Sequence, residues 1–361
     1  MELTGRHELF GLTGPILLTG HTGFKGTWLS LYLKHLGIQT IGYSLGPAMD
    51  SLYTRIKNEH RIPECIADIR DYSSLEKFIN EYKPTHIIHL AAQPLVLESY
   101  KNPRETFDVN VTGTINLLDI AFKTDFVKGI VIVTTDKVYK NDNLGRKFKE
   151  NDPLEGKDPY SASKVSVESV IRAWQQIARI NGGPQITSVR AGNVIGGGDL
   201  AEDRLLPDII RAHITDSKVE IRNPQSTRPW QHVLDPLRGY LMALERISTD
   251  VPIESLNFGP VEDSLNVMEV VDICKKSLRL HVMYPSGDHE IKGEKNQESE
   301  NLSLDSTCAF DVIGWKPAWK QEYAINKTID WWKYILNNGG SAKDACMIDI
   351  EHFLISLGNQ T

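Results

Sequence analysis

Cysteine is scarce in this chain of 361 residues. The four cysteines, Cys65, Cys274, Cys308 and Cys346, are scattered, with no CxxC pair and no spacing that is typical of a metal site. This pattern argues against a disulfide framework. It predicts reduced thiols, no bound metal and a cytoplasmic protein.

Long apolar runs and blocks of one charge are also missing. No run of about 18 apolar residues is present, and residues 1–14 are mixed and charged, unlike the apolar core of a signal peptide. The 40 basic and 47 acidic side chains give a net charge of -7 without a basic block. We therefore expect no membrane and no nucleic-acid partner, and one or two ordinary globular domains.

A glycine-rich turn follows the first apolar run. Ile16–Leu18 leads into glycines at Gly20, Gly23 and Gly26, and a helical pattern follows over residues 28–36. Strand, glycine turn and helix in this order are typical of a dinucleotide site, where the helix N-terminus binds a pyrophosphate. A tight turn without a ligand is the alternative.

Strand and helix patterns alternate through the first half of the chain. The expected strands are 15–20, 38–44, 85–90, 129–135 and 186–191, and the expected helices are 26–36, 75–82, 103–123 and 161–180. Such alternation predicts an α/β fold with a doubly wound parallel sheet of the Rossmann type. We assign residues 1–192 to this dinucleotide-binding domain.

The pattern changes after residue 192, and we assign residues 193–361 to a smaller α/β domain that binds the substrate, with segments crossing between the two domains. The expected helices are 203–216, 235–247, 266–278, 318–336 and a short C-terminal one; the expected strands are 219–222 and 256–258, and 288–303 is a polar loop. Asn266 with Glu269 resembles a capping box.

Tyr160 and Lys164 are the first candidates for chemistry. They are four residues apart within an expected helix, so they share one face. A lysine ammonium near the phenol lowers the pKa of the phenol, which can then act as a base near neutral pH. An exposed helix face with an incidental tyrosine and lysine is the alternative.

Several strings of residues together carry a family resemblance, which extends from about residue 12 to residue 317. They are GHTGFKG at 20–26, HLAA at 89–92, NVTGT at 110–114, TTDKVY at 134–139, YSASK at 160–164, RAGNVIGGGD at 190–199, AEDRL at 201–205 and NPQSTRPWQHV at 223–233. The chain resembles the extended short-chain dehydrogenase/reductase family of sugar-nucleotide enzymes and, within it, the CDP-glucose 4,6-dehydratases.

The resemblance implies a lyase reaction with NAD as cofactor. Such enzymes oxidise C4 of a nucleotide-linked glucose, eliminate water across C5 and C6, and return the hydride to C6. The product is a 4-keto-6-deoxy sugar for deoxysugar biosynthesis, of the kind that supplies the O-antigen of lipopolysaccharide. CDP as the nucleotide rests on the resemblance alone.

The resemblance also implies catalytic roles. Tyr160 takes the proton of the 4-hydroxyl, Thr135 hydrogen-bonds that group, and Asp136 protonates the departing 6-hydroxyl. Lys137 stands where dTDP-glucose relatives have the glutamate that removes the C5 proton. Either Lys137 is that base, with a lowered pKa, or it is a cation that orients other groups.

Cofactor contacts follow from the same resemblance. The expected cofactor-binding residues are Gly20, Thr22, Gly23, Phe24, Lys25, Gly26, Asp68, Ile69, Leu90, Ala91, Ala92, Gln93, Tyr160 and Lys164. Asp68 fits the position that holds adenine, or else it is a helix N-cap. The second strand ends at 42–45 without the usual carboxylate for the ribose, so NADP stays open.

Substrate contacts are expected from Thr135, Asn193, Arg204, Arg228 and His232. The two arginines are candidates for the diphosphate, because a guanidinium matches the geometry of a phosphate group. Surface salt bridges are the alternative for the arginines, and a buried core position is the alternative for His232.

Two rival functions and one assembly complete the expectations. An epimerase or 4-reductase of the same superfamily shares the tyrosine and lysine but needs no acid at Asp136, and a non-catalytic NAD-binding regulator needs neither. We expect a homodimer in which helices 103–123 and 161–180 of two subunits form a four-helix bundle. The apolar residues for it are Phe107, Val111, Leu117 and Ile120 on the first helix and Val165, Val167, Val170 and Trp174 on the second.

Overall fold

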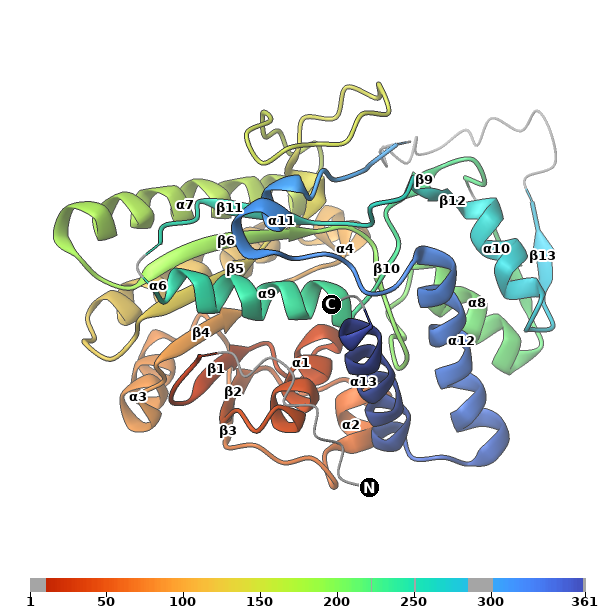
Figure 1. Cartoon of the computed structure of the whole chain (residues 1–361), viewed down its shortest axis with the longest axis horizontal. Helices are drawn as coiled ribbons and strands as arrows, with labels where there is room; N and C mark the ends of the chain where they lie inside the picture. Colours follow the sequence, from red (N-terminus) through yellow and green to blue (C-terminus); the bar gives the residue numbers. More distant parts are fainter. Residues whose placement is uncertain (1–10, 222, 250, 285–300, 360–361) are drawn as a thin grey trace.

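The computed structural model describes residues 11–221, 223–249, 251–284 and 301–359. Its centre is a seven-stranded parallel sheet in the order β11-β6-β5-β4-β1-β2-β3 (Figure 1). The strands are β1 Ile16–Thr19, β2 Thr40–Ser44, β3 Glu64–Ile66, β4 His86–His89, β5 Gly129–Val133, β6 Gln185–Ala191 and β11 Ser255–Phe258. The strand order reverses between β1 and β4, which confirms the doubly wound fold.

The inner strands are buried along their whole length, as their continuous apolar sequences require. Alternate residues face opposite sides of the sheet. Ile16 and Leu18 pack in one core with Trp28, whereas Leu17 packs in the other core with Leu117.

Helices cover both faces of the sheet. Helices α1 (Phe24–His35) and α9 (Leu234–Ile247) lie on one face, and α3 (Tyr72–Tyr82), α6 (Gly113–Phe122) and α7 (Pro159–Asn181) lie on the other. The register pairs Thr19 with both Tyr43 and His89, so the carboxyl ends of three strands meet at one edge. Ligands of such sheets bind at this edge.

The C-terminal part adds a second group of elements beside the carboxyl edge (Figure 1). Its helices are α8 Leu205–Thr215, α10 Val267–Lys275, α12 Gln321–Asn338 and α13 Ala342–Gly358, whereas α11 Thr307–Ile313 packs on α9 and β11 (Figure 1). Its short strand pairs are β7 Val194–Ile195 with β10 Gln231–His232, β9 Thr227–Arg228 with β12 Leu265–Asn266, and β8 Lys218–Glu220 with β13 His281–Met283. Three segments after residue 192, α9, α11 and β11, belong to the large sheet and its cover. The sheet is therefore built from both sides of the expected boundary.

Some expected elements differ in detail. The helix expected over 103–123 is α5 (Pro103–Phe107), a π-helical turn (Asp108–Thr112) and α6. Several short elements were not predicted, because each is too short for a periodic pattern. They include the helices α2 Leu52–Ile56, α4 Val96–Lys101 and α11, and the strands β3, β7, β9, β10, β12 and β13. The capping box at Asn266 and Glu269 is confirmed, although α10 ends at Lys275 and not at Leu278. Arg222 of an expected strand and residues 288–300 of the expected loop lie outside the described residues.

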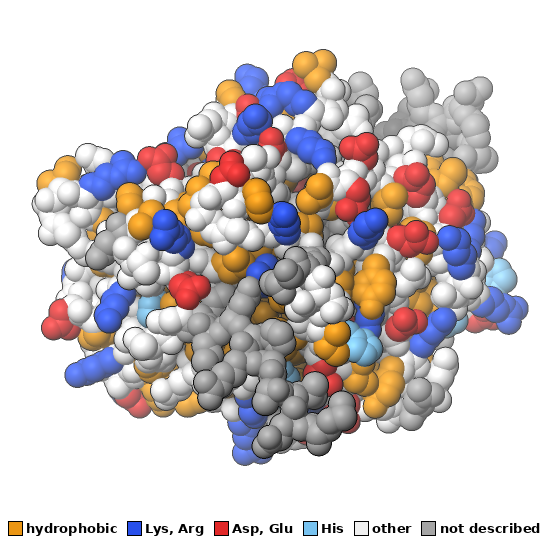
Figure 2. All heavy atoms as spheres, viewed as in Figure 1, with side chains coloured by type: hydrophobic (Ala, Val, Ile, Leu, Met, Phe, Trp, Pro, Cys, Tyr) orange, Lys and Arg blue, Asp and Glu red, His pale blue; other side chains and the backbone are white. Residues whose placement is uncertain are grey.

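The described surface carries both signs of charge. Basic and acidic side chains are interspersed over the face in Figure 2. In the part of the chain that the structure describes, no helix is long and apolar enough to cross a membrane. Among the same residues, no group of three histidine, cysteine or acidic side chains could hold a metal ion, and the four cysteines are unpaired.

Candidate active site

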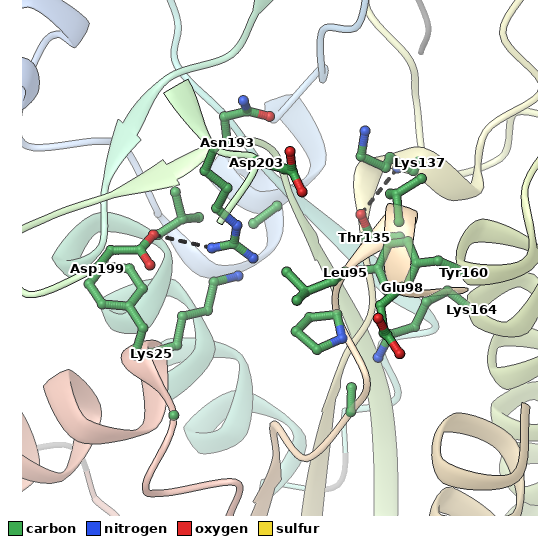
Figure 3. A pocket seen from close by; sticks show the side chains of 18 of the residues that line it. Lys25, Leu95, Glu98, Thr135, Lys137, Tyr160, Lys164, Asn193, Asp199 and Asp203 are labelled. Atoms are coloured by element: carbon green, nitrogen blue, oxygen red, sulfur yellow. Dashed lines mark hydrogen bonds and ion pairs between the residues drawn. The ribbon is translucent and has the colours of Figure 1, made fainter. Parts of the chain in front are cut away.

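A cavity of about 740 Å³ opens at the carboxyl edge of the sheet. It is lined by the glycine loop, by the segments that follow β4, β5 and β6, and by residues of the C-terminal part. In Figure 3, Lys25, Asn193 and Asp199 lie on one side of this cavity, and Thr135, Lys137 and Tyr160 lie on the other. The cavity thus brings together the first and second halves of the chain.

The glycine loop has no room for side chains where it meets the sheet and α1. Gly20 has a positive φ of 73°, and a Cβ there would lie 2.8 Å from the backbone nitrogen of Ala91. A Cβ on Gly26 would lie 2.2 Å from the carbonyl oxygen of Gly20. Gly23 is the N-cap of α1, so no side chain caps this helix. The first N–H groups of α1 can therefore bind an anion, which fits the expected pyrophosphate.

The segment after β3 carries Asp68 and Ile69 into the cavity lining. Asp68 accepts two hydrogen bonds from the Arg70 guanidinium, at 2.9 and 2.6 Å, and one from the backbone N–H of Arg70. These bonds from Arg70 lower the pKa of Asp68, against the opposing effect of burial. The N-cap of α3 is Asp71 and not Asp68, so the alternative role for Asp68 is wrong.

The end of β2 is neutral. Thr22 hydrogen-bonds the Ser44 hydroxyl at 2.8 Å and donates to the carbonyl of Leu45 at 2.9 Å. All three residues line the cavity. The position that holds a ribose in dinucleotide sites therefore offers hydroxyl groups in place of a carboxylate.

The segment after β4 lines the cavity through Leu90, Ala91 and Ala92, as expected. Gln93 is not part of the lining. Its side chain bonds the Thr106 hydroxyl at 2.8 Å and the backbone of Leu95, so Gln93 shapes this loop from behind. The prediction of a direct cofactor contact by Gln93 is not supported.

Thr135 and Asp136 follow the end of β5. Asp136 is 3% exposed; its Oδ1 accepts a hydrogen bond from Thr135 Oγ1 at 3.1 Å. Its Oδ2 has no partner among the described residues. Burial raises the pKa of Asp136, although the nearby charge of Lys137 and the Thr135 hydroxyl oppose this effect. A carboxyl group that holds its proton more firmly than usual suits a general acid.

Lys137 lies in the 3₁₀ turn Asp136–Val138 that follows Thr135. Its backbone N–H donates to Thr135 Oγ1 at 3.3 Å, and its side chain lines the cavity (Figure 3). The positive charge of Lys137 favours the ionised form of Asp136. The structure thus places Lys137 beside the acid, as both alternatives for its role require.

Tyr160 and Lys164 project from the first turns of α7, which Asp158 caps. Burial raises the pKa of Tyr160 to about 12, and a hydrogen bond with Thr135 opposes that rise. The amine of Lys164 donates to the carbonyl oxygen of Val133 at 3.1 Å, and burial lowers the pKa of Lys164 to about 8. The expected lowering of the phenol pKa is not seen in this structure, because burial dominates the proton affinity of Tyr160.

A group of cations faces these residues. Burial and the adjacent charge of Arg204 lower the pKa of Lys25 to about 8. Arg204 pairs with Asp199 at 3.2 Å and is 39% exposed on its side chain. Arg228 and Asn193 also line the cavity, as expected for substrate contacts. Arg204 also forms the salt bridge that was the alternative, because it pairs with Asp199 and lines the cavity at the same time.

His232 does not reach the cavity. It is fully buried between Trp28 and Trp319, with ring centroids 5.6 and 4.7 Å away, and its Nε2 lies 3.8 Å from Asp349 Oδ2. Burial lowers the pKa of His232 to about 3. The prediction of a substrate contact is therefore corrected to a core position.

Two buried charged residues beneath the site were missed. Glu168 and Arg190 form an ion pair at 2.8 Å and are 2% and 1% exposed. The sequence contained a signal for the first of them, because Tyr160, Lys164 and Glu168 follow one another at intervals of four residues. No local signal marks Arg190 as its partner.

Comparisons with known proteins agree with this geometry. Residues 17–328 match the family described as GDP-mannose 4,6 dehydratase. A CDP-glucose 4,6-dehydratase of Salmonella typhimurium is 40% identical over 330 residues, which are 88% of this chain and 90% of that protein.

Solved structures share the fold. A dTDP-glucose 4,6-dehydratase from Bacillus anthracis in complex with NAD has a TM-score of 0.75 at 21% identity, covering 90% of this chain and 98% of that one. A UDP-glucose-4-epimerase from Stenotrophomonas maltophila with bound NAD has a TM-score of 0.78 at 20% identity, covering 90% of this chain and all of that one. At these identities the likeness concerns the fold alone.

Proposed function

Because the chain belongs to the GDP-mannose 4,6-dehydratase family, within the extended short-chain dehydrogenases/reductases, we propose that it converts CDP-glucose to CDP-4-keto-6-deoxyglucose with NAD as cofactor. The observation that carries the proposal is the buried carboxyl group of Asp136, with its raised pKa, beside Thr135 and Tyr160. A reaction that expels a hydroxyl group needs such an acid.

The cofactor site fits a dinucleotide. The uncapped N-terminus of α1 and the glycine cradle, which a Cβ at Gly20 or Gly26 would fill, support binding of a pyrophosphate there. Gly23, Phe24, Asp68 and the segment 90–92 would hold the remainder. NAD would supply the acceptor for the C4 hydride and, once reduced, the donor of that hydride to C6, so that the net reaction would be redox-neutral.

Tyr160 serves the first step. Its phenolate accepts the proton of the 4-hydroxyl, with Thr135 as the hydrogen-bonding neighbour that keeps the two oxygens in place. Because burial raises the pKa of the phenol, a nearby positive charge must favour the phenolate. Lys164, on the same helix face, would supply such a charge, as would the positively charged nicotinamide of NAD.

Asp136 serves the second step. Its carboxyl group donates a proton to the departing 6-hydroxyl, so that water and not hydroxide leaves. Hydrogen bonding from Thr135 fixes Oδ1, and Oδ2 is the oxygen without a protein partner among the described residues. We therefore assign the transferred proton to Oδ2.

We assign the removal of the C5 proton to Lys137. The amine lines the cavity next to the acid. The cation alternative, in which Lys137 only stabilises developing negative charge, is separated from it by the exchange experiment in the Discussion. In both cases Lys137 acts on the same intermediate as Asp136.

Substrate binding falls to the cations and amide on the far side of the cavity. Arg204 and Arg228 bind the diphosphate, and Asn193 faces the sugar nucleotide. Thr135 contacts the sugar at the 4-position. These roles leave cytosine recognition to other lining residues.

The test is direct. The protein is incubated with NAD and, in separate reactions, with CDP-, dTDP-, UDP- and GDP-glucose, and the products are weighed by mass spectrometry. Loss of water from the CDP sugar supports the proposal. Isomerisation without a change in mass points instead to an epimerase, the absence of any change points to a regulator, and water loss from another nucleotide corrects the base.

We further propose a cytoplasmic homodimer. The four unpaired cysteines are in keeping with a reducing compartment. Of the eight apolar residues expected at the interface, Leu117, Ile120 and Val167 are buried within the subunit, so the contact would rest on the others, including Phe107 at 36% exposed. Sedimentation at micromolar concentration tests this, and a monomeric mass rejects the dimer.

A further inference from the structure

Glu168 is a buried carboxylate on the same face of α7 as Tyr160 and Lys164. Arg190, from β6, donates hydrogen bonds of 2.8 Å to both of its oxygens. Burial alone would raise the pKa of Glu168, but the bonds and charge of Arg190 bring it below the usual value. An ionised carboxylate is therefore fixed beneath the catalytic residues, where an unpaired one would be strongly destabilising.

One end of the catalytic segment is attached to this ion pair. Thr134 Oγ1 donates to Glu168 Oε1 at 2.6 Å, and this bond is buried. Thr134 comes directly before Thr135 and Asp136. The bond therefore fixes the chain at the point where β5 ends and the catalytic turn begins.

The other end of the segment is attached to the same pair. Tyr139 comes directly after the turn Asp136–Val138, and its hydroxyl accepts a hydrogen bond from Arg190 at 2.7 Å. That hydroxyl donates in turn to Asn257 Oδ1, also at 2.7 Å. Tyr139 and Asn257 are 2% and 0% exposed, so water does not compete for these bonds.

We propose that Glu168, held by Arg190, is a positioning residue that ties both ends of the segment 134–139 to α7 and thereby sets Asp136 relative to Tyr160. Both Asp136 and Tyr160 act on one sugar ring, so their separation must be held closely. A displacement of about 1 Å costs on the order of 100-fold in rate. The proposal rests on the proposed dehydratase function, because that function requires Asp136 and Tyr160 to act in sequence.

The chain offers a matched pair of variants. Replacing Glu168 itself would leave the charge of Arg190 buried without a counter-ion, which is strongly destabilising, so a loss of rate could not be separated from a loss of folding. Thr134→Val removes only the hydroxyl that fixes the catalytic segment, and the backbone bond from Thr134 to Val189 at 2.9 Å remains. Ser188→Ala removes an equivalent hydroxyl, which bonds the other oxygen of Glu168 at 2.9 Å but lies on β6, away from the segment.

The experiment measures water loss in a single turnover of CDP-glucose with NAD, by rapid quench and mass spectrometry, together with the free energy of unfolding. We expect Thr134→Val to slow water loss by roughly 10- to 100-fold, Ser188→Ala to stay within about twofold, and Thr134→Ser, which restores the hydroxyl, to recover most of the rate. Similar stability of Thr134→Val and Ser188→Ala would show that the difference in rate is positional.

Two results would overturn the inference: a full rate in Thr134→Val, or an equal loss in Thr134→Val and Ser188→Ala. Water release by the wild-type protein tests the proposed function separately. If it releases no water from any sugar nucleotide, the dehydratase proposal fails, whereas wild-type turnover with indifferent variants rejects only the positioning role of Glu168.

Discussion

Thr135 and Asp136 are joined by a hydrogen bond of 3.1 Å from the hydroxyl to one carboxyl oxygen, while the other oxygen has no partner among the described residues. The same Thr135 also bonds Tyr160. The hydroxyl of Thr135 therefore links the proposed base of the first step, Tyr160, to the proposed acid of the second step, Asp136.

Asp136→Asn separates the two steps. The amide keeps the size and hydrogen bonding of the side chain but cannot give up a carboxylic proton. C4 oxidation should continue, so absorbance of NADH should appear on mixing and persist, while water loss falls by roughly 10²-fold or more. Normal dehydration in this variant would instead favour the epimerase or reductase function.

The pH dependence of water loss follows from the same residue. Because burial raises the pKa of Asp136, its proton is present at low pH and is lost as pH rises through that pKa. The rate of elimination, measured in single turnovers, should therefore fall toward high pH, and this fall should disappear in the slow residual reaction of Asp136→Asn. A rate that rises with pH over the whole range would contradict the role of acid.

Tyr160→Phe should abolish turnover and leave binding intact. The phenolic oxygen is needed to accept the proton of the 4-hydroxyl, and the phenylalanine ring still fills the same buried space. The loss should be on the order of 10²- to 10⁴-fold in kcat, with cofactor and sugar-nucleotide dissociation constants close to those of the wild type by calorimetry. An unchanged kcat would remove Tyr160 from the mechanism.

Lys137→Met distinguishes the base from a mere cation. If the amine removes the C5 proton, exchange of that proton with deuterium in solvent should stop in this variant, and water loss should stall with it. Exchange at the wild-type rate, followed by nuclear magnetic resonance of the recovered sugar nucleotide, would assign the proton to another group and leave Lys137 as an electrostatic aid.

Gly26→Ala should damage the cofactor site. The added Cβ would lie 2.2 Å from the Gly20 carbonyl oxygen, so the loop or α1 must move. Overpacking of this kind costs about 1–3 kcal/mol, which urea unfolding can measure, and NAD titration should show weaker binding. Gly46→Ala is the control, since the nearest atom to a Cβ there is 3.8 Å away; equal effects at both positions would refute the steric argument.

Buried histidines should make the fold sensitive to acid. Burial lowers the pKa of His86 from 6.5 to about 4, so the unfolded chain binds a proton that the folded chain does not between those values. Its contribution to stability is complete above pH 6.5 and is lost as pH falls toward 4. The raised pKa values of Asp235, about 7, and Asp349, about 6, act in the opposite sense over the same range.

His86→Asn isolates that contribution. The difference in free energy of unfolding between wild type and variant should shrink by about 2 kcal/mol between pH 7 and pH 5, as urea titrations at each pH can show. His35→Asn, at the exposed end of α1, controls for removing one imidazole from the unfolded chain. A difference that stays constant with pH for His86→Asn would show that this side chain is not buried as a neutral group.

The sequence was sufficient where a function depends on neighbours along the chain. The three glycines, the Tyr160–Lys164 pair and the Thr135–Lys137 string lie at fixed local spacings, and the structure places all of them around one cavity. The alternation of strands and helices likewise predicts the sheet, because a parallel strand needs a crossover of this length.

Predictions failed where distant segments decide the environment. His232 is enclosed by Trp319 and approached by Asp349, which lie about 90 and 120 residues further along the chain. The pKa of Tyr160 depends on how deeply it is buried, and no local spacing records that depth. The ion pair between Glu168 of α7 and Arg190 of β6 was not predicted for the same reason.

The edge strand β11 has a consequence for protein engineering. It comes from the C-terminal part, yet it pairs with β6 from Ser255↔Ser188 to Phe258↔Ala191. A fragment that stops at residue 192 would leave the peptide groups of β6 unpaired at an open edge, which invites aggregation. A chimera that exchanges residues 193–361 to change the nucleotide would import a foreign edge strand as well. A chimera that keeps the native sheet must therefore retain α9 and β11 and exchange the segments before and after them separately.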